Sequence, residues 1–244
     1  MSRYFLEVSY KGTKYAGFQI QDNANTIQSE VERALGIYFR ERISLTGSSR
    51  TDAGVHAAQN YFHFDCVEKD EATIMASVYH LNAILPSDIV IKSIKSVSDT
   101  KHCRFDAKSR SYQYTIYQSK DPFLADRAYY FPYRIDIEQL NQAAAVIKDT
   151  THFEAFSKRN VQVKTFTCTI IESEWKQEGE LLIYRVKGNR FLRGMVRGLV
   201  GTMLKVGTGK INQEDFFAIV QSNDVSKVDF STPAHGLILM KVDY

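Results

Sequence analysis

The sequence predicts an α+β protein made of two successive units, each with the element order strand, helix, strand, strand, helix, strand. Strand-like alternation opens both halves, at residues 4–10 and 111–118. Each half also carries two segments in which apolar residues recur at helical spacing. With 44% hydrophobic residues among 244, the chain can bury a core without disulfides or a structural metal. No low-complexity linker separates the halves, so we expect them to act as one body.

The first unit begins with a half-buried strand, because residues 4–10 alternate between apolar and polar side chains. Thr26 is the expected N-cap of a helix over residues 27–39, where apolar residues recur every four positions. Residues 43–46 and 59–64 are the next two predicted strands.

A second helix follows in this unit, with Asp70 as its N-cap and its end before Pro86. Residues 89–97 form the closing strand. The residues that this helix is expected to bury are Ile74, Val78 and Leu81.

The second unit repeats this order. Its first strand, residues 111–118, places Tyr112, Tyr114 and Ile116 on one face. Residues 177–179 predict a hairpin turn between two strands. The remaining elements are a helix over 136–148, strands over 164–176 and 180–187, a helix over 190–205 and a strand over 237–242. A further helix, over 214–221, is inserted into this order.

This β-α-β-β-α-β order is that of the ferredoxin-like unit. We therefore expect two such units side by side, forming an extended antiparallel sheet with helices on one side and a cleft at the seam. Residues 1–105 and 106–244 are the expected units. A cleft between two units is a natural place for a substrate.

The composition of the chain indicates the cellular compartment in which it is expected to work. Three widely spaced cysteines, an odd number without a CxxC pair, argue against a disulfide framework or a zinc site and favour a cytoplasmic protein. Residues from Met1 onward enter a strand pattern, and no apolar run approaches membrane-spanning length, so neither a signal peptide nor a membrane span is expected. The net charge of +3 is only weakly basic.

Asp52 is the most informative carboxylate, in a polar stretch between two predicted strands. By spacing alone, the better interpretation is an Asx-turn in which Gly54 supplies unusual dihedral angles. The alternative is a nucleophile or general base, because the cation of Arg50 favours the ionised carboxylate. Gly54 would also let the backbone approach a ligand closely.

Residues 50–57, RTDAGVHA, resemble the catalytic motif of the TruA family of tRNA pseudouridine synthases. The sequence differs from the family pattern at two places: Phe18 stands where the family has Trp, and Ser48-Ser49 stand where Ala-Gly is expected. Further segments resemble family motifs in family order: residues 10–19 (YKGTKYAGFQ), 82–89 (NAILPSDI), 102–107 (HCRFDA), 112–114 (YQY) and 195–201 (MVRGLVG).

The resemblance implies a cofactor-free and metal-free isomerisation of uridine to pseudouridine at positions 38–40 of the tRNA anticodon stem-loop. Asp52 would be the nucleophile or base. The resemblance also implies a homodimer, with one tRNA contacting both subunits.

Three further roles come from the family. Tyr112 would stack on the target uracil, although the residue types alone equally suit a tyrosine packed in the sheet. Arg197 would form an ion pair with Asp52. From the sequence alone, the ordinary interpretation of Arg197 is a surface arginine with a buried stem. Arg50 would enter the stem and hold a flipped-out nucleotide, or else support only its own loop.

Basic clusters predict the RNA-binding surface. A run of like charges is more often a solvated face, but several around one expected cleft suit a polyanion. The residues are Lys101, His102, Arg104, Lys158, Arg159, Arg190 and Arg193.

Two alternatives remain. One is a non-catalytic RNA-binding protein on the same scaffold. The other is an aspartate-based hydrolase, which lacks a recognisable second carboxylate. His56 and His63 show no metal-ligand spacing with Asp52 and are expected to be structural.

Overall fold

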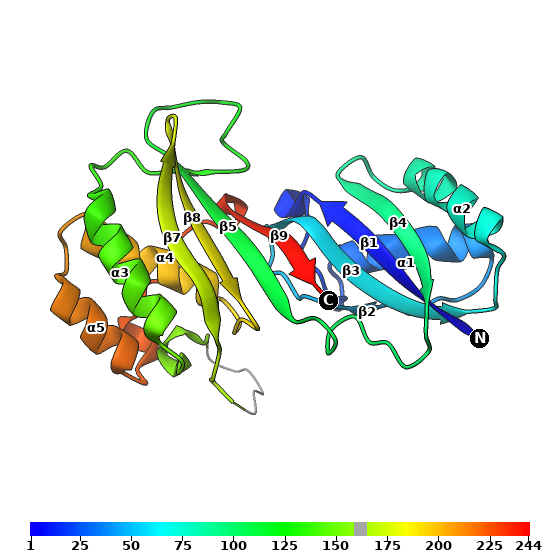
Figure 1. Cartoon of the computed structure of the whole chain (residues 1–244). Coiled ribbons are helices and arrows are strands. Elements are labelled where there is room, and N and C mark those ends of the chain that lie inside the picture. The colour runs from blue at the N-terminus through cyan, green and yellow to red at the C-terminus, as the bar shows by residue number, and fades with distance from the viewer. Residues whose placement is uncertain (159–164) are drawn as a thin grey trace. The chain divides into compact units, whose positions relative to one another are not determined.

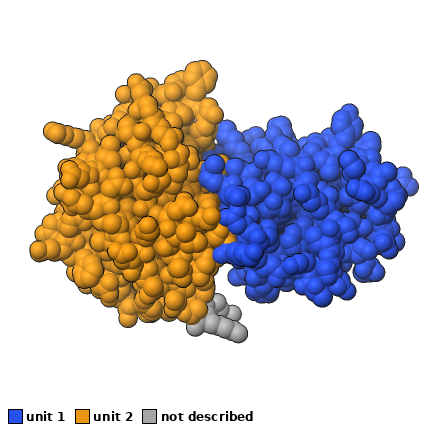
Figure 2. All heavy atoms as spheres, in the orientation of Figure 1, with its two compact units in different colours: residues 1–108, 239–244 blue, residues 109–238 orange. Residues whose placement is uncertain are grey.

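A computed structural model of the chain describes residues 1–158 and 165–244. It is a mixed α+β protein, which confirms the predicted class. The chain forms two compact units, residues 1–108 with 239–244 and residues 109–238, here called the first and second units (Figure 2). The last six residues therefore group with the beginning of the chain.

The first unit is an antiparallel sheet with two helices against it (Figure 1). Its strands follow the order β4-β1-β3-β9, and β2 pairs with β3. The elements are β1 (Ser2–Tyr10), α1 (Ile27–Phe39), β2 (Thr46–Gly47), β3 (His56–Cys66), α2 (Glu71–Ile84), β4 (Ile89–Val97) and β9 (Leu237–Asp243).

One face of this sheet forms the core. In β1, Tyr4 lies opposite Phe64 and Leu6 lies opposite Phe62, and all four side chains are buried, as the alternation predicts. Helix α1 starts at the predicted Thr26, whose hydroxyl accepts the N–H of Ser29 in a capping box.

Two details of the first unit differ from the sequence prediction. Strand β2 begins only at Thr46, because side chains of α1 take the backbone bonds of Leu45: its N–H donates to Glu32 and its carbonyl accepts from Gln28. In α2, Ser77 is buried and Val78 only half-buried. The Ser77 hydroxyl donates to the Ile74 carbonyl at 2.6 Å, which satisfies it in the interior.

The second unit is also a sheet covered by helices (Figure 1). Its strands follow the order β5-β8-β7, and β6 pairs with β5. Tyr114 is fully buried and donates its hydroxyl to the Pro233 carbonyl at 2.8 Å, so it packs within the unit. The elements are β5 (Ser109–Tyr117), β6 (Tyr129–Tyr130), α3 (Ile137–Asp149), β7 (Ile170–Glu178), β8 (Leu181–Gly188), α4 (Met195–Gly207) and α5 (Gln213–Gln221).

The helix predicted over residues 190–205 begins only at Met195. Gly194 has φ 74°, a left-handed conformation that α-helix does not contain. Phe191 precedes the helix and packs edge-on against Tyr112, with ring centroids 5.1 Å apart. The strand predicted over 164–176 begins at Ile170, and Lys164 lies outside the described residues.

Small residues of α4 serve packing within the unit. A Cβ on Gly201 would lie 2.2 Å from the Asp229 carbonyl oxygen, and one on Gly198 would lie 2.8 Å from the Phe230 ring. The segment after α5 can therefore lie directly on the helix. Among the described residues, no helix is long and apolar enough to span a bilayer.

Candidate active site

Asp52 lies in the loop between β2 and β3 and is half-buried. Its backbone carbonyl accepts the N–H of Val55 at 3.1 Å, which closes a four-residue turn. Gly54 is the third residue of this turn, and its φ of 80° is the conformation for which glycine is suited. A turn is therefore present at Asp52 and is closed by the main chain, while the Asx-turn, which the Asp52 side chain would close, stays a prediction.

The segment after β1 holds this loop in place. The N–H of Phe18 donates to the Thr51 carbonyl at 3.1 Å, and the N–H of Gly54 donates to the Tyr15 carbonyl at 3.3 Å. The Tyr15 hydroxyl bonds the Asp88 carboxylate at 2.5 Å. Motifs that are far apart in the sequence thus meet around Asp52.

Gly12 makes the closest approach to the loop. A Cβ at this position would lie 2.0 Å from the Val55 carbonyl oxygen, so only a glycine fits without a shift of backbone. The N–H of Gly12 also donates to Nδ1 of the buried His56 at 2.9 Å. His56 therefore serves as a backbone anchor at the end of the loop.

Phe18, which stands where the family motif has Trp, packs under the same loop. Its ring stacks on Phe62 with centroids 4.4 Å apart and planes 12° apart. A Cβ on Gly47 would lie 2.0 Å from the Phe18 ring. The smaller aromatic ring thus fills a close-packed position in this chain.

Buried polar side chains bind the loop from inside the sheet. Asn60 is fully buried, and its amide nitrogen donates to the Ser49 carbonyl at 2.8 Å and to the Tyr10 hydroxyl at 3.1 Å. The hydroxyls of Tyr10 and Thr51 share a hydrogen bond of 2.8 Å. The residues on both sides of Arg50 are therefore tied to strands, while Arg50 itself is exposed.

The other two predicted substrate residues lie in the second unit. Arg197 is half-buried on α4; its Nε donates to the Thr232 carbonyl at 2.7 Å and its Nη2 to the Phe230 carbonyl at 3.3 Å. These bonds hold the guanidinium while using two of its five donors. Tyr112 is half-buried at the start of β5. The pairing of Arg197 with Asp52 stays a prediction.

Those predicted RNA-binding residues that the structure describes occupy loops. Lys101, Arg104 and Arg193 are exposed. The N–H of Lys158 donates to the Arg193 carbonyl at 3.1 Å, which brings two of the basic residues together. His102, Lys158 and Arg190 are half-buried, and Arg159 lies outside the described residues.

His63, His102 and Cys103 form a cluster in which one ligand-type atom of each lies within 4.8 Å of the others. Nδ1 of His102 accepts the N–H of Arg104 at 3.1 Å, and Nδ1 of His63 accepts that of Cys103 at 3.3 Å. The Cys103 thiol donates to the Thr46 carbonyl at 3.1 Å. Burial, with lesser effects of His102 and Arg3, lowers the pKa of His63 to about 4. Hydrogen bonds within the protein thus engage all three side chains, and we assign the cluster no ion.

Comparison with known proteins assigns the chain to a family. The family model described as tRNA pseudouridine synthase matches residues 7–106 and 144–244. The chain belongs to the tRNA pseudouridine synthase family. A tRNA pseudouridine synthase A of Parabacteroides distasonis is 40% identical over 244 residues, covering 100% of this chain and 96% of the relative. Another, of Porphyromonas gingivalis, is 40% identical and covers 100% and 98%; one of an Exiguobacterium species is 38% identical and covers 100% and 98%.

Buried polar residues surround the 50–57 motif of this pseudouridine synthase, and the sequence did not predict their role. Tyr10 and Asn60 contact the loop from positions 41 and 11 residues away. One signal was present: Asn60 lies in line with Phe62 and Phe64 on the buried face of its strand, where a polar side chain needs a specific partner.

Proposed function

We propose that the chain converts uridine to pseudouridine in tRNA, with Asp52 as the catalytic carboxylate. The proposed reaction is supported by the membership of the chain in the tRNA pseudouridine synthase family. The carboxylate is supported by one structural observation: a half-buried aspartate stands in a loop whose backbone is hydrogen-bonded on both sides. Such preorganisation is what a reacting group needs, because a displacement of about 1 Å can cost about a hundredfold in rate.

The proposed reaction is an isomerisation that consumes no co-reactant. The C1′–N1 bond of the uridine breaks, the base turns, and a C1′–C5 bond forms. C5 loses its hydrogen as a proton and N1 gains a proton, so the product is an isomer of the substrate. Asp52 acts as nucleophile or base, and both roles need the ionised form. The overall change conserves every atom of the nucleotide except for the exchanged proton.

The other predicted residues would hold the nucleotide. Tyr112 offers its ring to the detached base. Arg197, whose guanidinium is oriented by two carbonyls, would pair with the Asp52 carboxylate. Arg50 projects from the same loop and would stabilise the flipped-out nucleotide.

The proposal extends to substrate and setting. The substrate positions are uridines 38–40 of the anticodon stem-loop, and a homodimer would bind one tRNA with both subunits. The protein would work in the cytoplasm, where its three buried cysteines, none of them in a disulfide, suit a reducing environment.

Position mapping tests the proposal. An unmodified tRNA transcript with uridines at 38, 39 and 40 is incubated with the protein, and pseudouridine is located by carbodiimide labelling and primer extension. We expect stops at these positions, and none when they hold cytidine. Binding of the transcript without any stop would favour the non-catalytic RNA-binding alternative.

Affinity for tRNA should depend strongly on salt. Basic loop residues such as Lys158 and Arg193 would displace counterions from the phosphates. We expect affinity to fall at least about tenfold between about 50 and about 200 mM salt in filter binding. Arg193→Gln should reduce the slope of log affinity against log salt by about one.

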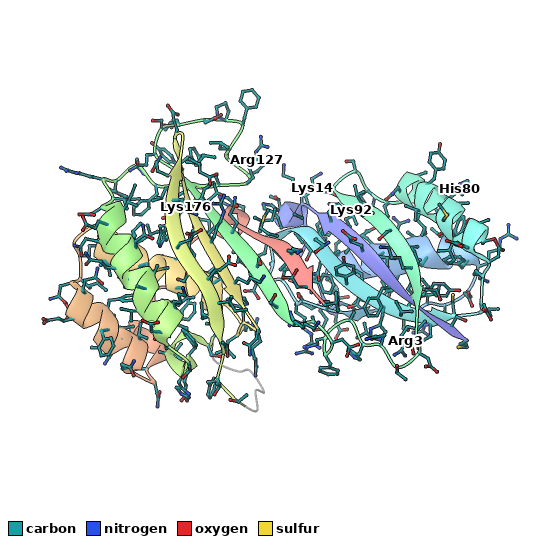
Figure 3. All side chains as sticks on the ribbon, viewed as in Figure 1. Arg3, Lys14, His80, Lys92, Arg127 and Lys176 are labelled. Atoms are coloured by element: carbon teal, nitrogen blue, oxygen red, sulfur yellow. The ribbon has the colours of Figure 1, made fainter. Side chains whose placement is uncertain are left out.

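Lys176→Gln is the matched control for this measurement. Lys176, on β7 (Figure 3), already pairs with Glu174 at 2.8 Å. Its replacement should leave the slope unchanged. An affinity that does not respond to salt would contradict the proposed electrostatic surface.

A further inference from the structure

The loop that presents Asp52 is attached to the sheet by three side chains that interact with each other. Tyr10 ends β1, Asn60 lies within β3, and Thr51 immediately precedes Asp52. All three are buried. The Asn60 amide contacts the Tyr10 hydroxyl at 3.1 Å, and this hydroxyl contacts that of Thr51 at 2.8 Å. We call this set the Asn60–Tyr10–Thr51 chain.

Asn60 gives the chain a fixed origin. Its side-chain oxygen accepts the N–H of Tyr61 at 2.9 Å, which sets the orientation of the amide. The amide nitrogen then faces both the Tyr10 hydroxyl and the Ser49 carbonyl. Because both polar atoms of the buried Asn60 side chain are hydrogen-bonded, the side chain has one preferred rotamer. This rotamer in turn fixes the positions of its hydrogen-bond partners.

Thr51 is held through two different atoms. Its hydroxyl bonds Tyr10, and its carbonyl accepts the N–H of Phe18 at 3.1 Å. With both groups fixed, the position of the next Cα, that of Asp52, follows within narrow limits. On the other side, the carbonyl of Asp52 is bonded to Val55.

We propose that Tyr10 is a positioning residue for the reaction: through the Asn60–Tyr10–Thr51 chain its hydroxyl holds Asp52 where the carboxylate can act on the ribose or base. The inference rests on the proposed function of Asp52. Tyr10 itself is buried and acts through Thr51. Its hydroxyl should therefore matter for the rate of the bound complex and leave tRNA affinity unaffected.

Tyr10→Phe tests this directly, because it removes one oxygen and keeps the ring. Under single-turnover conditions with saturating enzyme, we expect the rate to fall between about tenfold and about a hundredfold. The dissociation constant for tRNA should stay within about twofold of the wild-type value, since the substitution removes no contact that binds tRNA. A wild-type rate, or a rate loss matched by lost affinity or lost folded protein, would overturn the inference.

Tyr61→Phe is the matched control. Tyr61 is next to Asn60 on β3, and its hydroxyl donates to Glu7 at 3.1 Å. The substitution removes the same atom and one hydrogen bond, but from the side chain that lies on the opposite face of the strand. It should keep the wild-type rate; a loss equal to that of Tyr10→Phe would mean that the effect is general and would overturn the assignment.

Thr51→Val supplies a second variant with the same shape and no hydroxyl. If the two hydroxyls act through their shared bond, Thr51→Val should slow the reaction like Tyr10→Phe, and the double variant should be no slower than either. Additive losses would contradict a common action. The proposed function fails separately: it fails if Asp52→Asn remains active, whatever Tyr10→Phe does.

Discussion

Replacing Asp52 with asparagine should reduce isomerisation by at least about a thousandfold and leave the fold and tRNA affinity close to those of the wild type. The amide has nearly the shape of the carboxylate but neither its charge nor its nucleophilicity. The main-chain bonds that build the turn are retained, since they involve the Asp52 carbonyl rather than its side chain. The measurement is the single-turnover rate of pseudouridine formation, with filter binding and thermal unfolding in parallel.

Asp22→Asn provides the control for this substitution. Asp22 is exposed and lies in the segment before α1, away from the turn in sequence. It should retain the wild-type rate. An Asp52→Asn variant that is folded, binds tRNA and isomerises at more than a tenth of the wild-type rate would exclude Asp52 from the chemistry.

Gly12→Ala should have the largest effect on stability. The added Cβ would fall 2.0 Å from the Val55 carbonyl oxygen. The Cβ is bonded directly to the main chain and the oxygen is a main-chain atom, so no side-chain movement can relieve the overlap. We expect a loss of about 3 kcal/mol in the free energy of unfolding, measured by urea denaturation. The reaction rate of the remaining folded protein should also fall, because Val55 closes the turn that begins at Asp52.

Gly36→Ala is the matched control. Gly36 lies inside α1, and the nearest atom to its Cβ would be the Glu41 carbonyl oxygen at 3.6 Å, an ordinary contact. Because alanine favours helix, stability should be unchanged or rise by up to about 1 kcal/mol. Equal destabilisation by both substitutions would contradict the close approach of Gly12 to the loop.

Local patterns predicted much of the fold. The alternation that begins at Tyr4 gave the face of β1, and Thr26 marked the start of α1, because both signals depend on near neighbours. The start of α4 was placed too early. Apolar spacing continues through Phe191, but the left-handed backbone at Gly194 separates that residue from the helix, and its ring packs on Tyr112 instead.

The site was only partly predictable. Asp52 was found through its motif, and spacing alone would have left it a turn residue. The support around it depends on pairs such as Tyr10 with Thr51 and Gly12 with Val55, which lie more than 40 residues apart. No local pattern encodes such pairs, because the fold brings them together through the pairing of β1 with β3.

Release of tritium from C5-labelled uridine in tRNA tests the central claim most directly, since the hydrogen on C5 must leave when the base is joined to the ribose through that carbon. The wild-type protein should release tritium from the labelled anticodon stem-loop, and Asp52→Ala should release none above background while still binding the tRNA. No release by the folded, tRNA-bound wild-type protein, or release that survives in Asp52→Ala, would contradict the account.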